Sequence, residues 1–268
     1  MSFQDFKDLH QGPGLLLLPN AWDAVSARLI ESVGAKAIAT TSAGLAWSLG
    51  YADGSALPED QFIAATRRIT RVIQVPLTID VEAGYSDDPR TVAEFVGRAL
   101  DVGVVGINIE DGAGAADLLC RKIEAIRERA LQLGAGLFIN TRTDVILRGL
   151  ASGEAATEEI LRRASRYGAA GADGLFVPGL SGENAMAAIS AAVQPMPLNV
   201  MAIPNLPPIE KLQQSGVRRL SAGSALAQAA IGNTRRLAST FLAGAMNDLF
   251  DESMSYGAVN GLFAVSSG

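Results

Sequence analysis

Acidic residues follow two neighbouring apolar segments of the sequence, at the point where each segment ends. Asp80 lies at the end of the segment at 77–81 and Glu82 directly follows it, and Glu110 lies at the end of the segment at 106–111. Asp80 and Glu82 are two residues apart, so their side chains share one face if the segment is a strand. Carboxylates that lie close together repel one another unless a cation or a proton intervenes. An oxygen-only donor set with no His or Cys nearby favours a hard ion, which predicts a Mg²⁺ site, with Mn²⁺ as the alternative ion.

Two further segments offer groups that bind anions. Arg142 follows the apolar segment at 137–141, and its planar guanidinium suits two-point binding of a carboxylate or a phosphonate. Thr41, Ser42 and Ala43 form an expected turn that offers hydroxyl and backbone N–H groups to an anion. Each interpretation has a plainer alternative. Arg142 could form a structural salt bridge, and each acid could be a helix N-cap or a solvated loop charge.

These residues must be positioned by short strands that alternate with helices. Eight apolar segments are expected as strands, at 15–20, 37–42, 77–81, 106–111, 137–141, 174–178, 198–201 and 218–222. Most are apolar along their whole length, as parallel strands buried on both faces are. Segments with helical spacing lie between them, at 22–33, 58–72, 89–102 and 154–167. The alternation predicts a (β/α)₈ barrel, in which catalytic groups gather at the carboxyl ends of the strands. A doubly wound open sheet is the alternative, but no Gly-x-Gly-x-x-Gly follows the first strand to support it.

Length and composition fit one barrel that acts on a small molecule. The chain has 268 residues, of which 49% are hydrophobic, and its net charge is −6. A negative charge argues against nucleic acid or an anionic membrane as a partner. The N-terminal segment lacks the features of a signal peptide, and no apolar run is long enough to span a bilayer. A cytoplasmic location is therefore expected.

The sequence contains one histidine and one cysteine. His10 precedes the first expected strand and is expected to be exposed, which argues against a catalytic triad built on histidine. Cys120 lies in an expected helix that starts near Ala115, and it is expected to be a buried structural thiol. A single cysteine excludes an internal disulfide and fits a reducing compartment.

Several motifs resemble a known superfamily over nearly the whole chain. The chain is similar to the isocitrate lyase/phosphoenolpyruvate mutase superfamily, and in particular to its phosphonomutase-like branch. The segments that carry the resemblance are PNAWDAVSARLIE (19–31), ATTSAGLAWSLGYADG (39–54), IDVEAGYSDDP (79–89), GINIEDG (106–112), INTRTD (139–144), GADGLFVPG (171–179) and VRRLSAGSALA (217–227). Their order and spacing make the resemblance specific.

The resemblance implies a metal site at the carboxyl ends of the strands. The aspartate that binds the metal in the family falls on Asp80. The other metal-site acids of the family, which hold the ion partly through water, fall on Asp53, Glu82 and Glu110. Glu82 stands where the best-known members have aspartate, so its longer arm could move a bridging water.

The resemblance also implies how a substrate is held. The arginine that binds the substrate anion falls on Arg142, and the turn that grips the substrate carboxylate falls on Thr41, Ser42 and Ala43. Arg142, together with the acids at 53 and 110, is therefore expected in catalysis. The family further implies a C-terminal helix that is exchanged between subunits. We expect a barrel domain at 1–245, a tail at 246–268 that packs on a neighbouring subunit, and a homodimer or homotetramer.

One departure from the family concerns proton transfer. Isocitrate and methylisocitrate lyases carry a long gating loop after the fourth strand, with a Lys-Lys-Cys-Gly-His signature whose cysteine is the general acid. Here Gly112, Ala113 and Gly114 lead almost directly into the next helix, and Cys120 is not the equivalent of that cysteine.

The sequence therefore predicts a Mg²⁺-dependent lyase that acts on a small carboxylate. It would cleave a C–C bond next to a 2-oxo or 2-hydroxy carboxylate through an enolate, with decarboxylation included. Two alternatives remain open. One is P–C chemistry of the phosphonopyruvate mutase or hydrolase type, and the other is a protein that binds a small acid without turnover.

Overall fold

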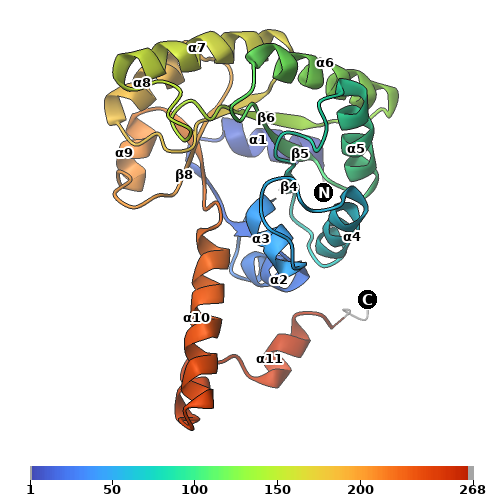
Figure 1. Cartoon of the computed structure of the whole chain (residues 1–268), viewed down its shortest axis with the longest axis vertical. Helices are drawn as coiled ribbons and strands as arrows, with labels where there is room; N and C mark the ends of the chain where they lie inside the picture. Colours follow the sequence, from blue (N-terminus) through green and yellow to red (C-terminus); the bar gives the residue numbers. More distant parts are fainter. Residues whose placement is uncertain (1, 265–268) are drawn as a thin grey trace.

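Parallel strands and helices alternate along the chain in the computed structural model, which describes residues 2–264 (Figure 1). The strands are β1 (Leu16–Leu18), β2 (Asn20–Ala21), β3 (Ile38–Thr40), β4 (Leu77–Asp80), β5 (Gly106–Glu110), β6 (Phe138–Arg142), β7 (Gly174–Phe176), β8 (Leu198–Met201) and β9 (Val217–Ser221). Their order in the sheet is β1-β9-β8-β7-β6-β5-β4-β3-β2. β1 and β2 are two halves of one expected strand, divided at Pro19, which has no N–H to donate. The two ends of the sheet therefore belong to the same strand, and the expected (β/α)₈ barrel is confirmed.

Helices surround the barrel at nearly the positions that the sequence predicts. They are α1 (Phe3–Gln11), α2 (Ala24–Ser32), α3 (Ser42–Ser48), α4 (Glu59–Thr70), α5 (Pro89–Asp101), α6 (Ala116–Gln132), α7 (Gly153–Ala169), α8 (Glu183–Ala192), α9 (Ile209–Gln214), α10 (Ala225–Leu242) and α11 (Tyr256–Gly261), with a 3₁₀ turn η1 (Asn247–Leu249). Local signals set the boundaries. Asp88, for example, accepts hydrogen bonds from the backbone N–H groups of Arg90 and Thr91, and Pro89 occupies the first turn of α5.

The interior of the barrel is polar at mid-height, below the strand ends that carry the acids. Nδ2 of Asn140 donates to Oδ1 of Asn108 at 2.9 Å and to Oδ1 of Asn199 at 3.0 Å. Nη2 of the fully buried Arg219 donates to the same oxygen of Asn108 at 3.0 Å. Burial lowers the pKa of Arg219 to about 9, although the charge of Asp80 opposes this effect.

His10 is buried, and the expectation that it is exposed is wrong. Its side chain is 4% exposed because α1 packs against the amino end of β6. The imidazole stacks on Phe138 with ring centroids 4.3 Å apart, and Nδ1 lies 2.8 Å from the carbonyl oxygen of Phe6. Burial lowers the pKa of His10 to about 3. The spacing of Phe6 and His10, one helical turn apart, was the available signal for a buried face.

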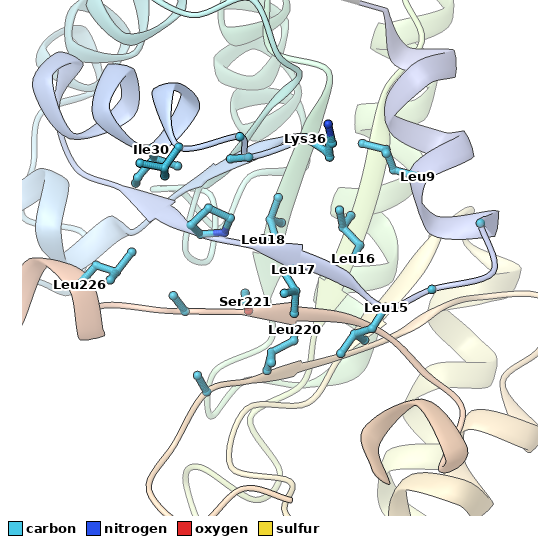
Figure 2. Close-up of a pocket in the computed structure, with 18 of the residues that line it drawn as sticks. Leu9, Leu15, Leu16, Leu17, Leu18, Ile30, Lys36, Leu220, Ser221 and Leu226 are labelled. Atoms are coloured by element: carbon cyan, nitrogen blue, oxygen red, sulfur yellow. The ribbon is translucent and has the colours of Figure 1, made fainter. Parts of the chain in front are cut away.

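None of the described helices covers the outer side of β1, because α10, the helix that follows β9, does not pack there. α10 projects away from the barrel (Figure 1). A groove of about 1120 Å³ lies beside β1. It is lined mainly by leucine side chains, Leu220 among them, and by Ile30 (Figure 2). Leu17, in the middle of β1, is 50% exposed. No helix within residues 2–264 is both long and apolar enough to cross a membrane.

The described residues after α10 are mostly exposed to solvent. Their side chains are exposed or half-buried, and Nε of Arg28 on α2 donates to the carbonyl oxygen of Leu262 at 2.8 Å. The expected packing of the 246–268 tail on a neighbouring subunit stays a prediction, and residues 265–268 lie outside the described part of the chain.

Candidate active site

Three neighbouring strands bring the expected acids and the arginine to one mouth of the barrel. Asp80 is the last residue of β4, Glu110 the last of β5 and Arg142 the last of β6. β5 pairs with both of the other strands, and Glu110 is the register partner of Arg142. Glu82 follows β4 by two residues. The parallel sheet therefore gathers residues that are far apart in sequence.

Asp80 is held in place by groups from the preceding strand, β3, and from the start of α3. Its Oδ2 accepts a hydrogen bond from Oγ of Ser42 at 3.0 Å, and its backbone N–H donates to Oγ1 of Thr40 at 3.0 Å. Burial raises the pKa of Asp80, while the charge of Arg142 and the hydrogen bond from Ser42 act in the opposite direction. The surroundings of Asp80 thus disfavour the charged form of its carboxyl group.

The expected turn after β3 is the start of a short helix. Thr41 is the N-cap of α3, and Ser42 and Ala43 are its first two residues. Gly44 in the same turn has no room for a side chain, because a Cβ there would lie 2.8 Å from Cβ of Trp22. Close packing of α3 on Trp22, between β2 and α2, therefore helps to fix the hydroxyl of Ser42 beside Asp80.

Glu82 turns toward the segment that carries Asp53. One of its carboxylate oxygens accepts from the backbone N–H of Ser55 at 2.6 Å and from the Ser55 hydroxyl at 3.1 Å. The other accepts from the hydroxyl of Tyr85 at 3.0 Å. Burial raises the pKa of Glu82, and the charges of Asp80 and the exposed Asp53 raise it further. Sequence reasoning did not identify Ser55 or Tyr85 as partners of this acid.

Arg142 forms ion pairs with two carboxylates. Its Nη1 lies 2.8 Å from Oε2 of Glu110, and its Nε and Nη2 lie 2.7 and 3.1 Å from the two carboxylate oxygens of Asp144. The structural salt bridges considered as an alternative are therefore present. A guanidinium has five N–H donors, so donors remain for a bound anion. Burial raises the pKa of Glu110 to about 8 although Arg142 opposes it.

Asp111, the acid next to Glu110, points away from the mouth. Its carboxylate accepts from Oγ1 of Thr143 at 2.8 Å, from Nη1 of Arg163 at 2.7 Å and from the hydroxyl of Tyr167 at 2.6 Å. Asp111 is thus a structural residue that ties the end of β5 to α7. Arg163 and Tyr167, four residues apart on α7, were the sequence signal for a shared buried contact.

The donor set fits a hard cation held largely through water. Within residues 2–264, no three His, Cys, Asp or Glu side chains converge closely enough to enclose a metal ion. Asp80, Glu82 and Glu110 nevertheless supply only oxygen atoms, and the pKa of each is raised by burial. A cation such as Mg²⁺ would relieve this excess of negative charge, with few direct protein ligands and several waters.

Comparison with known proteins gives the family. The model of phosphoenolpyruvate phosphomutase matches residues 6–242. The chain belongs to the phosphoenolpyruvate phosphomutase family. This membership confirms the resemblance to the isocitrate lyase/phosphoenolpyruvate mutase superfamily, whose members are lyases, mutases and hydrolases.

Relatives of this phosphoenolpyruvate phosphomutase family member cover most of the chain. An uncharacterised protein of Mycobacterium tuberculosis is 36% identical over 224 residues, which are 82% of this chain and 81% of that protein. Oxaloacetate decarboxylase of Pseudomonas entomophila is 30% identical over 246 residues, or 85% of this chain and 81% of that protein. A solved structure from Burkholderia cenocepacia, provisionally assigned as a phosphonomutase, is 36% identical with a TM-score of 0.84, and the match covers 89% of this chain and 99% of that one.

The loop after β5 is short, as the sequence indicates. α6 begins at Ala116, so only residues 111–115 separate it from β5. This family member has no room there for a long gating loop. Cys120 is half-buried on α6, less buried than expected, and burial raises the pKa of its thiol. A raised pKa makes the thiol less reactive.

Proposed function

We propose that this protein is a Mg²⁺-dependent lyase that cleaves a C–C bond next to the carboxylate of a 2-oxo or 2-hydroxy acid, decarboxylation included. The observation that carries the proposal is the cluster of Asp80, Glu82 and Glu110 beside Arg142 at the mouth of the barrel. The similarity to oxaloacetate decarboxylase over most of both chains supports this class of reaction.

The acids would hold the cation and keep it oriented. Asp80 would bind it directly, and Asp53, Glu82 and Glu110 would bind its waters. Bound Mg²⁺ supplies Lewis-acid stabilisation for the negative charge that develops on the substrate during bond cleavage. Ser55 and Tyr85 fix the carboxylate of Glu82 and so restrict where a bridging water can lie.

Arg142 and the start of α3 would hold the substrate anion. The hydroxyl group of Thr41 and the backbone N–H of Ala43 are available donors for a carboxylate, while the hydroxyl of Ser42 already donates to Asp80. The guanidinium of Arg142 would stabilise charge as an enolate forms. Glu110 and Asp53 are the acids that could carry protons near the reacting atoms.

A phosphonate substrate is the second candidate. The matching family model is that of a P–C bond mutase, and the Burkholderia cenocepacia relative was assigned to phosphonate chemistry. The same acids and arginine would suit phosphonopyruvate. A non-catalytic protein that binds a small acid is the third candidate, because the loop that handles protons in the lyases is missing.

A substrate panel distinguishes these candidates. Purified protein with Mg²⁺ is assayed against 2-oxo and 2-hydroxy dicarboxylic acids for release of pyruvate or a related oxo acid, and against phosphonopyruvate for release of phosphate. Oxo-acid release supports the lyase, and phosphate release supports the phosphonate enzyme. Binding of these acids without any product would identify a binding protein.

A further inference from the structure

A second pocket lies beside the acid cluster. Its volume is about 360 Å³, and Glu82 and Glu110 are among the residues that line it. The β5–α6 loop also lines it, together with Lys122 of α6 and Arg148 of the segment after β6. Neither Arg142 nor the start of α3 lines this pocket. The pocket therefore adjoins the site already described and extends it in a direction that the family motifs do not account for.

Lys122 places a buried cation in the pocket wall. Its side chain is 3% exposed, and its Nζ donates to the carbonyl oxygen of Ala83 at 2.9 Å. Its acidic neighbour is Asp87, whose carboxylate lies 3.7 Å away and whose side chain is 94% exposed. Solvent weakens such a pair. A buried ammonium needs compensating charge, so an anion in the pocket would stabilise Lys122.

Arg148 places a second cation at the entrance of the pocket. Its Nε lies 3.4 Å from Oδ2 of Asp144, and that carboxylate is already paired with Arg142 at 2.7 Å. Gly112 of the loop lies against the guanidinium, since a Cβ there would be 3.9 Å from Nε and Nη2 of Arg148. Arg148 shares Asp144 with Arg142, and its side chain is half exposed. N–H donors of its guanidinium are therefore free for a ligand.

Three of the four acids that line the pocket are compensated by other groups, and the fourth, Asp87, is exposed to solvent. Glu110 is paired with Arg142 at 2.8 Å, and Asp111 is paired with Arg163 at 2.7 Å. Glu82 accepts hydrogen bonds from Ser55, which also lines the pocket, and from Tyr85, which does not. The first turn of α6 also opens here without a side-chain cap, so its unpaired N–H groups add partial positive charge.

We propose that this pocket binds a second anionic group of the substrate, a carboxylate on the far side of the bond that is cleaved, and that Lys122 and Arg148 select for it. The inference rests on the proposed function, because it assumes that the 2-oxo acid end of the substrate lies at the acid cluster. It narrows the substrate class to acids in which the departing fragment carries its own carboxylate.

Two small acids test the proposal without turnover. Oxalate presents only the chelating end of such a substrate, whereas 2-oxoglutarate presents the same end and a second carboxylate. Dissociation constants of both are measured with Mg²⁺ by calorimetry for the wild type, for Arg148→Gln and for Lys122→Met. Arg162→Gln is the matched control, because Arg162 is also a half-exposed arginine paired with a nearby carboxylate on its own segment.

We expect Arg148→Gln and Lys122→Met to raise the dissociation constant of 2-oxoglutarate at least tenfold. The dissociation constant of oxalate should stay within twofold of the wild-type value. Arg162→Gln should change neither, and Arg148→Lys should retain part of the affinity. Because Arg148 is half exposed, its variants test the pocket even if Lys122→Met does not fold. Suppose instead that Arg148→Gln binds oxalate and shows the same ratio of dissociation constants for 2-oxoglutarate and oxalate as the wild type. That result would overturn this inference and leave the proposed function standing. Failure of the wild type to bind either acid would overturn the proposed function and this inference together.

Discussion

Nη1 of Arg142 lies 2.8 Å from Oε2 of Glu110, and the two residues are register partners at the ends of adjacent strands. In the absence of a cation, this guanidinium is the nearest compensation for the acids of the mouth. We therefore expect metal binding and anion binding by Arg142 to be coupled, since a cation that neutralises Glu110 would leave more of the guanidinium available to a ligand.

Replacement of Asp80 should abolish most of the affinity for Mg²⁺. Asp80 is the one acid of the cluster that is both at a strand end and held by Ser42, so it is the expected direct ligand. We expect Asp80→Ala to lose Mg²⁺ binding measured by calorimetry, and Asp87→Ala, in the exposed loop beyond, to lose much less. Equal affinity of Asp80→Ala and the wild type would contradict the assignment.

Arg142→Lys should lower kcat/KM while metal binding survives. Lysine keeps the charge but loses the planar fork that binds two oxygens. The loss should be about 2 kcal/mol, within the range of a hydrogen bond to a charged group, which is roughly 30-fold in rate. The measurement pairs steady-state kinetics with thermal melting. A lower melting temperature with unchanged kcat/KM would show that the pairs with Glu110 and Asp144 are the whole role of Arg142.

Stability without metal should depend on pH through Glu110. Its pKa is raised from the ordinary value of 4.5 to about 8, so the folded state binds this proton more tightly than the unfolded state does. The stability that this proton confers is complete below pH 4.5 and is lost as the pH rises through about 8. With EDTA present, Glu110→Gln should gain stability relative to the wild type over this range. A difference in melting temperature that stays constant with pH would refute the shift.

The groove beside β1 predicts self-association. In a (β/α)₈ barrel the helix after each strand covers the outside of the barrel, but α10 projects away and leaves Leu17 half exposed (Figures 1 and 2). We propose that α10 of a second copy packs in this groove, since Ile231 and Phe241 are 53% and 52% exposed. This would be consistent with the expected homodimer or homotetramer.

Light scattering tests this association. Leu17→Asp and Ile231→Asp should shift the protein toward a monomer, because each places a charge in the apolar interface. Leu131→Asp is the control, since Leu131 is 80% exposed on α6. A wild type that is monomeric at micromolar concentration would rule out the proposed interface.

The sequence predicts the barrel and its mouth because both depend on local order. Apolar segments define the strands, and the residue that ends each strand lies at the mouth, which places Asp80, Glu110 and Arg142 together. Contacts between distant segments are not predictable in this way. The hydrogen bonds of Ser55 and Tyr85 to Glu82 arise from loop geometry, and all three residues have positive φ values of 60°, 62° and 51°.

Burial of polar residues was also hard to predict. His10 was expected at the surface because histidine is polar and the segment precedes the barrel, yet α1 closes the amino end of the strands. Arg219 lies at an inward position of β9, where alternation alone places it inside the barrel. Its burial depends on Asn108 across the barrel, which no local pattern reveals.

The most direct test of the lyase is Mg²⁺-dependent release of pyruvate from oxaloacetate and from larger 2-oxo and 2-hydroxy dicarboxylic acids. The rate with Mg²⁺ alone is subtracted, and Asp80→Ala is assayed in parallel. We predict turnover on the order of 1–10³ s⁻¹ for at least one acid, lost in excess EDTA and in Asp80→Ala. Isocitrate and 2-methylisocitrate should be cleaved negligibly, because the loop that carries the general acid is absent, and Cys120→Ser should behave as the wild type. A rate that persists in EDTA, or no oxo-acid product from any of these acids, would contradict the account.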